Sequence, residues 1–240
     1  MKLELIGLIL LLFISTISFG EEKVDPSLIG CWQFNEGKGD VVEDLSPFDN
    51  FGMVRGAKWV EDGIGHSLEF DGIDDYVEIP SSASLHITDE VTIFVWIKQR
   101  KFKEVAWGDI VRKGGPANYA IYSHQVSGNI ISSHYYNIND KWEPEWMVTT
   151  ACFIDEWHHI AFVLQENLMG KLYFDGKLVE IQKFGAKPKP NSEALLIGTE
   201  PGLGRFFCGF IDEVRVYNRA FDPKEISQYY NSSRDLISKK

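Results

Sequence analysis

Positive charge is scarce in this 240-residue chain, in which 24 lysines and arginines face 35 aspartates and glutamates, giving a formal net charge of −11. Nucleic acids and anionic membrane surfaces are bound through basic patches, so the charge balance disfavours both as partners. Long apolar runs are also missing after residue 20, which disfavours a membrane-spanning helix in the rest of the chain. The composition, with 44% hydrophobic and 25% charged residues, is typical of a globular protein of one or two domains.

The one long apolar run lies at the start of the chain. Lys2 precedes a mostly apolar stretch at residues 5–17, and Ser18 and Gly20 are small residues at the positions that a signal peptidase reads. This pattern predicts a secretory signal peptide over residues 1–20, and therefore a secreted or cell-surface protein. The apolar stretch is short for a membrane span of about 20 residues, although an uncleaved anchor is the alternative.

Cysteine is nearly absent, with Cys31, Cys152 and Cys208 far apart in the sequence. No pair has the Cys-x-x-Cys spacing of a zinc or redox motif, so we interpret them as small buried apolar residues. Export would permit disulfides, and a bridge between Cys31 and Cys208 stays open as an alternative.

The chain after residue 20 alternates short apolar runs with turn residues, which indicates an all-β fold of antiparallel strands packed as a sandwich. The clearest pair flanks Asp175-Gly176, a dipeptide that tolerates the positive φ of a tight hairpin. The other predicted strands are residues 92–98, 119–122, 130–133, 159–164, 195–197 and 210–217, and six aromatic side chains are predicted in the core: Trp32, Phe34, Phe70, Trp96, Trp157 and Phe174.

One helix is predicted near the C-terminus. Asp222 is a good N-cap, Pro223 suits the first helical position, and Glu225 completes a capping box. We expect the helix to run from Pro223 to about Tyr230 and residues 231–240 to form a polar tail. The predicted organisation is then a signal peptide over 1–20, a short extension over 21–27 and one domain over 28–230.

Five segments in a fixed order resemble the laminin-G-like, concanavalin A-like jelly-roll family. They are GCWQFNEGKG from Gly30, SLEFDGIDDYVEIP from Ser67 with TIFVWIK from Thr92, DEWHHIAFV from Asp155 with KLYFDGKLV from Lys171, LLIGTE from Leu195, and GFIDEVRVYNRAF from Gly209. The resemblance implies a two-sheet antiparallel jelly roll with one curved face and one short C-terminal helix. Members of the family serve as carbohydrate-binding, adhesion and accessory modules.

The acidic run from Glu69 to Asp74 raises the question of catalysis, because related glycosidases carry a Glu-x-Asp-x-x-Glu strand. Here a Gly-containing turn interrupts the run, so we interpret Asp71-Gly72 as a hairpin with Asp74 and Asp75 bonding nearby backbone groups. His158 and His159 are adjacent on a strand and point to opposite faces, so they do not jointly chelate a metal. No nucleophile motif is present, and we predict a protein without catalytic residues.

Calcium is the predicted cofactor, in a structural role. Calcium takes oxygen ligands, and the turn over residues 44–50 offers several of them. The family resemblance implies that this turn lies near the last strand, so the predicted ligands are Asp44, Asn50 and Asp212. The alternative is that Asp44 and Asn50 cap a turn and Asp212 bonds backbone. The pentraxins share the fold, and the same resemblance implies ligand positions at Asn118 and Glu200, although the residues beside them depart from the pentraxin pattern.

The most unusual stretch is residues 135–146, which combine aromatic, amide and acidic side chains on what the sequence predicts to be a long loop. Sugar rings stack on aromatic faces while polar groups bond their hydroxyls, so this segment is predicted to bind carbohydrate; the alternative is that the aromatics cover one end of the core. The candidate ligand-binding residues here are Tyr136, Asn137, Asn139, Asp140, Trp142 and Trp146.

The sequence therefore favours a secreted, non-catalytic binding module for a glycan or an extracellular protein, stabilised by calcium. Two alternatives remain open: a polysaccharide hydrolase or lyase on the same fold, and an adhesion or structural module that binds protein only.

Overall fold

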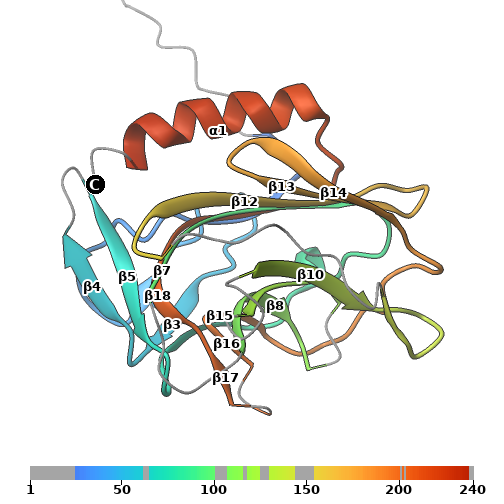
Figure 1. The fold of residues 1–240 in the computed structure, drawn as a ribbon. Coiled ribbons are helices and arrows are strands. Elements are labelled where there is room, and N and C mark those ends of the chain that lie inside the picture. Colours follow the sequence, from blue (N-terminus) through green and yellow to red (C-terminus); the bar gives the residue numbers. More distant parts are fainter. Residues whose placement is uncertain are drawn as a thin grey trace, which may run out of the picture.

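Antiparallel strands form two large sheets that pack face to face (Figure 1). The structure is a computed structural model that describes residues 25–61, 65–100, 107–115, 118–124, 130–143, 154–200, 202 and 204–237. The two-sheet architecture confirms the predicted jelly-roll sandwich. The predicted signal peptide, Trp146 and Cys152 lie outside the described residues.

The first sheet has the strand order β14-β13-β12-β7-β18-β5-β4, and β1 pairs with the part of β18 that β5 leaves open. Its strands are β1 (Leu28–Trp32), β4 (Lys58–Glu61), β5 (His66–Asp71), β7 (Val91–Gln99), β12 (Trp157–Leu164), β13 (Met169–Phe174), β14 (Lys177–Lys183) and β18 (Cys208–Tyr217).

The second sheet has the order β11-β10-β9-β8-β15-β6-β3-β2. Its strands are β2 (Val41–Val42), β3 (Gly52–Arg55), β6 (Tyr76–Ile79), β8 (Trp107–Lys113), β9 (Ala120–His124), β10 (Ile130–Tyr136), β11 (Trp142–Glu143) and β15 (Leu195–Ile197). A short third pair, β16 (Thr199–Glu200) and β17 (Arg205–Phe206), lies against β8, and one 3-10 turn, η1 (Ala83–Leu85), precedes β7.

The main core lies between the two sheets and follows the two-residue alternation of each strand. On β7, Ile93, Val95 and Ile97 point inward to this core, while Phe94 points to the opposite side. On β10, Ile131 and Tyr135 point inward, so Ser132, His134 and Tyr136 face away from the core. The outer face of the second sheet is therefore formed by the alternate side chains, which point away from the core.

The other face of the first sheet is covered by helix α1 (Pro223–Ile237), which crosses that sheet near β12 (Figure 1). The capping box is confirmed: Asp222 Oδ1 accepts the Lys224 and Glu225 amides at 2.8 Å, and Glu225 Oε2 accepts the Asp222 amide at 2.8 Å.

The helix runs two turns beyond the predicted end at Tyr230. Ser233 and Ile237 are buried on the same side as Ile226, and Trp96 Nε1 donates to Ser233 Oγ at 3.1 Å. Contacts with the first sheet hold this last part of the helix. The sequence of this part is mostly polar and did not indicate that it packs against a sheet.

Most predicted strands are confirmed, including the hairpin at Asp175-Gly176, where both residues have positive φ. The segment over 135–146 differs from the predicted loop, because Tyr136 pairs with Trp142 as the end of β10 meets β11. Trp157 and Phe174 are only partly buried.

The alternative disulfide between Cys31 and Cys208 is wrong, since both thiols are free. Cys31 lies opposite Arg215 on β18, while Cys208 starts the same strand opposite Asp71. Seven residues of strand separate those two positions by about 23 Å, far beyond the reach of a disulfide. Burial raises the pKa of the Cys31 thiol to about 11, as expected of an inert buried cysteine. Within the described ranges, no helix has the length and apolar character needed to cross a membrane.

Candidate ligand-binding site

A bulge in β8 places two opposite charges on the outer face of the second sheet. The register with β9 shifts between Asp109 and Val111, and both Ile110 and Val111 point into the core. Asp109 and Arg112 therefore share the outer face, although three residues apart on a regular strand they would face opposite sides. Arg112 Nη1 donates to Asp109 Oδ2 at 2.8 Å, and both side chains are almost fully buried.

Aromatic rings lie over this charged pair. Ala120 stands between Arg112 and His134 in the cross-strand register, and its small side chain leaves space above it. The Trp142 ring occupies the neighbourhood, with its centroid 4.5 Å from that of His134, 5.2 Å from that of Tyr136 and 5.6 Å from the Arg112 guanidinium carbon. Trp142 nevertheless keeps 43% of its surface exposed, so it presents an open aromatic surface to solvent.

A second carboxylate approaches from the β16–β17 pair. The Gly198 amide donates to the Ile110 carbonyl at 3.0 Å, so β16 continues along β8, and Glu200 lies opposite Arg205 in the ladder. Glu200 is only 7% exposed, and its Oε2 has no hydrogen-bond partner in the described part of the chain. The same is true of Asp109 Oδ1 and Ser132 Oγ. Buried acceptors without partners are rare in native proteins and point to a missing ligand or water.

The electrostatics of these groups are coupled. Burial, with the nearby Glu200 charge adding to it, raises the pKa of Asp109 to about 6, although Arg112 and Arg205 both oppose the shift. Burial, together with the charges of Arg112 and Arg205, lowers the pKa of His134 to about 3, so that imidazole is neutral at physiological pH. The site therefore holds two carboxylates, two guanidinium groups and one neutral imidazole.

We refer to this set as the Trp142 face; its members are Asp109, Arg112, His134, Tyr136, Trp142, Glu200 and Arg205. An exposed indole ring can stack on the apolar side of a sugar, and the unpartnered oxygens can accept its hydroxyl groups. Tyr136 and Trp142 were predicted from the sequence as carbohydrate-binding candidates, and Glu200 only as a ligand position implied by the pentraxin resemblance. Sequence reasoning missed Asp109, Arg112, His134 and Arg205. Only the bulge brings Asp109 and Arg112 together, and no pattern in the sequence predicts a bulge at this position.

The polar residues predicted around the same segment have different roles. Asn137 is fully buried and holds the β10–β11 turn, because its Oδ1 accepts the Asn139 and Lys141 amides and its Nδ2 donates to Glu143. Asn139 is exposed, and Asp140 is exposed and paired with Lys189. These residues shape the turn beside Trp142.

Asn118 lies apart from Glu200. Its Nδ2 donates to the Ile87 carbonyl at 2.7 Å and its Oδ1 accepts the Ile87 amide at 3.2 Å, so the side chain bridges two segments of backbone. Asn118 also bonds Lys113 at one end of β8, whereas Glu200 lies beyond Ile110 toward the other end. The structure does not bring these two predicted ligand positions together.

The predicted calcium ligands in the 44–50 turn are already engaged in hydrogen bonds. Asp44 Oδ1 accepts the amides of Cys31 and Ser46, and Oδ2 accepts the Asn50 amide and the Ser46 hydroxyl, all between 2.6 and 2.9 Å. Asn50 bonds the Ile29 carbonyl and two serines with its side chain. Asp212 is buried on β18, where its Oδ1 accepts the Glu213 amide. Four donors around one carboxylate describe a turn cap, and this donor set does not fit a cation.

Another acidic group lies in the β5–β6 turn. Asp71, Asp74 and Asp75 place one carboxylate oxygen each within 4.8 Å of one another. Their hydrogen bonds are those of the predicted hairpin: Asp71 Oδ1 accepts the Ile73 amide, and Asp75 Oδ2 accepts the Asp71 amide. Three carboxylates at this spacing could hold a calcium ion, but local turn chemistry also explains them. Glu69, the other acid of this run, pairs with Arg100.

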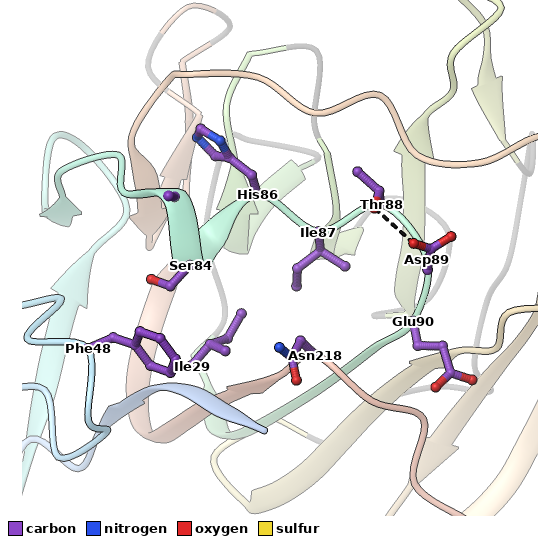
Figure 2. A pocket seen from close by; sticks show the side chains of 10 residues that line it. Ile29, Phe48, Ser84, His86, Ile87, Thr88, Asp89, Glu90 and Asn218 are labelled. Carbon is purple, nitrogen blue, oxygen red and sulfur yellow. Dashed lines mark hydrogen bonds between the residues drawn. The ribbon is translucent and has the colours of Figure 1, made fainter. Parts of the chain in front are cut away.

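Two hollows lie away from the Trp142 face. Figure 2 shows the first, a pocket of about 300 Å³ with Ile29 and Phe48 on one side and the loop carrying His86, Thr88 and Asp89 on the other. Its acidic groups already have partners, since Asp89 binds Thr88 and Lys187 and Glu90 accepts the Glu166 amide. The second, of about 400 Å³, is lined by Gln33, Asn35, Glu36, Glu43 and Leu45.

Comparison with protein families places the chain among known folds. The family described as the concanavalin A-like lectin/glucanases superfamily matches residues 71–227, which is more than half of the chain. The adhesion G-protein coupled receptor V1 of Danio rerio is 24% identical over 152 residues, covering 58% of this chain and 2% of the receptor. The match therefore concerns one small part of a very large protein.

Solved structures with the same fold include several binding domains. The binding domain of Paraclostridial mosquitocidal protein 1 superposes with a TM-score of 0.72 at 15% identity, covering 86% of this chain and 52% of that one. The ligand-binding domain of botulinum neurotoxin serotype D, in complex with N-acetylneuraminic acid, gives 0.67 at 13% identity, covering 86% and 51%. Domain 4 of the GH43 arabinanase AbnA from Geobacillus stearothermophilus, in complex with arabinotriose, gives 0.61 at 15% identity, covering 84% and 97%. At these identities the likeness shows the fold alone, and the chain spans about half of the toxin binding domains.

Proposed function

The chain belongs to the concanavalin A-like lectin/glucanases superfamily, and from that membership we propose that it is an extracellular, non-catalytic module that binds carbohydrate on its Trp142 face. One observation carries the proposal: the buried Glu200 carboxylate, with an oxygen that has no partner, lies on the same face as the exposed Trp142 ring. A buried oxygen without a hydrogen-bond partner is unfavourable, and a hydroxyl donor from a ligand would satisfy it.

The two parts of the face serve different needs of a sugar. The Trp142 ring is held by Tyr136 and His134, so it loses little freedom when a sugar stacks on it. Arg112 holds Asp109 in place, and the remaining oxygen of Asp109 is a buried acceptor without a hydrogen-bond partner among the described residues. Solved relatives in complex with N-acetylneuraminic acid and arabinotriose support a sugar as the ligand class.

The test is binding of the exported chain to a glycan array, comparing wild type with Trp142→Ala and Glu200→Gln. We expect each variant to lose about fivefold or more in affinity, because each removes a contact worth about 1–3 kcal/mol. Phe51→Ala is the matched control for Trp142, since Phe51 is a similarly exposed aromatic residue on another part of the molecule. Glu180→Gln on β14 is the control for Glu200. Full binding by Trp142→Ala and Glu200→Gln would place the ligand elsewhere and refute the proposal.

Calcium remains part of the proposal as a stabilising ion. The 71–75 turn supplies the better ligand set, because the oxygens of Asp44 already accept four hydrogen bonds. We expect calcium to raise the melting temperature over EDTA in wild type but not in a variant with Asp71→Asn and Asp74→Asn. An equal rise in melting temperature in that variant would show that calcium does not bind at this turn.

Export is proposed from the sequence over residues 1–20. N-terminal sequencing of the mature protein is expected to begin at residue 21. A chain that retains its first 20 residues on the membrane would favour the anchored alternative.

A polysaccharide hydrolase is the second candidate, and one observation favours it. The pKa of Asp109 is raised to about 6 on a face that carries a second carboxylate, which is the setting of a general acid beside a base. Turnover of a soluble polysaccharide that disappears in Asp109→Asn, with binding retained, would favour the enzyme over the binding module.

An adhesion module that binds protein only is the third candidate, and the match to part of an adhesion receptor favours it. In that case an extracellular protein partner would still bind after Trp142→Ala and no glycan would bind the wild type.

A further inference from the structure

We propose that the Trp142 face selects uncharged, hydroxyl-rich sugars and discriminates against glycans that carry a carboxylate, such as sialic or uronic acids. This inference rests on the proposed function and names the class of ligand at the same site. Its basis is that some oxygens of the face have no hydrogen-bond partner in the described part of the chain, whereas the guanidinium of Arg112 is already bonded.

The oxygens without hydrogen-bond partners on this face belong to two carboxylates and one neighbouring hydroxyl. Glu200 Oε2 and Asp109 Oδ1 lack hydrogen-bond partners within the described ranges, and Ser132 Oγ lacks one as well. A sugar hydroxyl donates a proton to such oxygens, whereas a carboxylate has no proton to donate at neutral pH. An anionic sugar would therefore add a third negative charge, and its carboxylate could not donate to the two already there.

Arg112, one of the two arginines of the face, is already bonded to acceptors of the protein. Arg112 uses Nη1 on Asp109, Nε on the Gly114 carbonyl at 2.8 Å and Nη2 on the Gly115 carbonyl, and its side chain is 2% exposed. A guanidinium held by three acceptors has no free edge for a bidentate bond to a ligand carboxylate. His134 is neutral at physiological pH because its pKa lies near 3, so it adds no positive charge.

Arg205 is the remaining cation, half-buried on β17. It lies directly opposite Glu200 in the ladder, so its charge balances a carboxylate that the protein itself supplies. The site is close to neutral with both acids ionised and both arginines charged. It would become net negative on binding an anion.

Gly202 lies beside the Glu200 carboxylate. Gly202 is exposed, and a Cβ at that position would stand 3.1 Å from Glu200 Oε1. A side chain at this position would therefore press on the Glu200 carboxylate, which is itself only 7% exposed. Gly202→Val should therefore reduce binding of neutral sugars without altering the charge of the face.

The test compares one complex-type N-glycan in two forms, fully sialylated and enzymatically desialylated, together with neutral galactan and polygalacturonate. We expect the neutral member of each pair to bind about tenfold or more tightly at low salt. Raising the ionic strength from 20 to 500 mM should shrink this ratio, because screening weakens the repulsion. Glu200→Gln should shrink the ratio as well, and circular dichroism checks that this variant is folded. The salt series provides the same test without a mutation.

The outcomes separate this inference from the proposed function. Equal or tighter binding of the sialylated or uronate member overturns the selectivity while leaving carbohydrate binding intact, and loss of that binding in Arg205→Gln would assign it to Arg205. Binding of neither member of either pair overturns the proposed function and this inference together. A preference for neutral sugars that salt does not change would refute the electrostatic cause.

Discussion

His159 makes a sharp prediction about acid stability because its ring is buried without any hydrogen-bond partner among the described residues. The imidazole is fully buried between the first sheet and α1, and neither ring nitrogen is bonded. Four aromatic rings surround it, with centroid distances between 5.3 and 5.9 Å: Phe94, Trp96, Tyr229 and Tyr230. In such a site the neutral imidazole is much more stable than the charged imidazolium, because a buried charge without a partner is unfavourable.

The magnitude follows from the shift. Burial lowers the pKa of His159 to about 3 from an ordinary 6.5, against a weak opposing effect of Asp175. Between pH 6.5 and 3 the unfolded chain binds a proton at this position and the folded chain does not. The free energy of unfolding therefore falls as the pH falls, by about 1.4 kcal/mol per pH unit, or about 3 kcal/mol at pH 4.5.

Other groups, among them His134 and Asp109, contribute over the same range, so a variant is needed to isolate His159. His134, whose pKa is also about 3, adds a similar loss. Asp109 acts in the opposite sense: its folded pKa of about 6 lies above the ordinary 3.8, so the folded chain binds the proton first. Its contribution rises as the pH falls from 6 toward 4, which partly offsets one histidine.

The assay is urea unfolding of wild type and His159→Phe at pH 7.0, 5.5 and 4.5, at constant ionic strength. Phenylalanine keeps a ring among the aromatic side chains and carries no titratable nitrogen. We expect the variant to gain about 3 kcal/mol relative to wild type between pH 7.0 and 4.5. His86→Gln is the control, because His86 is exposed and hydrated in both states. A difference between His159→Phe and wild type that stays constant with pH would refute the reasoning.

Three further variants test how the scaffold is held. Asp44→Ala removes the acceptor of four hydrogen bonds and should lower the free energy of unfolding by roughly 2–4 kcal/mol, equally in calcium and in EDTA; a loss confined to calcium would restore Asp44 as an ion ligand. Ser233→Ala leaves the buried Trp96 Nε1 without its acceptor and should lower the unfolding free energy by about 1–3 kcal/mol, measured by urea titration; no change would show that α1 docks without this bond. Gly209→Ala should be destabilising by more than about 2 kcal/mol, because Gly209 has φ 142° and a Cβ there would meet the Lys98 carbonyl; a melting temperature equal to wild type would contradict this.

The fold could be predicted from the sequence because its signals are local. The turn residues Asp175-Gly176 and the capping box at Asp222 each determine their own geometry within four residues. The alternation of apolar residues on β7 and β12 fixes which side faces the core. The end of α1 could not be predicted in this way, because Ser233 and Ile237 are held by contacts with a sheet more than a hundred residues earlier.

The candidate site was predicted only in part, and the reason lies in how its residues come together. Tyr136 and Trp142 could be found because an aromatic residue among polar ones is visible in the sequence. Asp109 and Arg112 could not, because regular strand periodicity puts them on opposite faces. The predicted ligands Asn118 and Asn137 failed to join the site because buried amides usually bond backbone, and both do so here.

The bulge at residues 109–111 is therefore the feature that links the fold to the proposed binding face. It sends two successive apolar residues, Ile110 and Val111, into the core. A carboxylate and a guanidinium thereby share the outer face, one on each side of that inward pair. Arg112 then holds Asp109 where one of its oxygens has no partner among the described residues. A bulge interrupts the hydrogen-bond ladder, and a regular strand would pair more favourably. Bulges are nevertheless frequent beside functional sites, where they re-aim a side chain. A buried ion pair contributes little to stability, so stability alone does not account for Asp109 and Arg112 on the outer face of the sheet. Binding of a polar ligand would account for the pair and for the acceptor that has no partner.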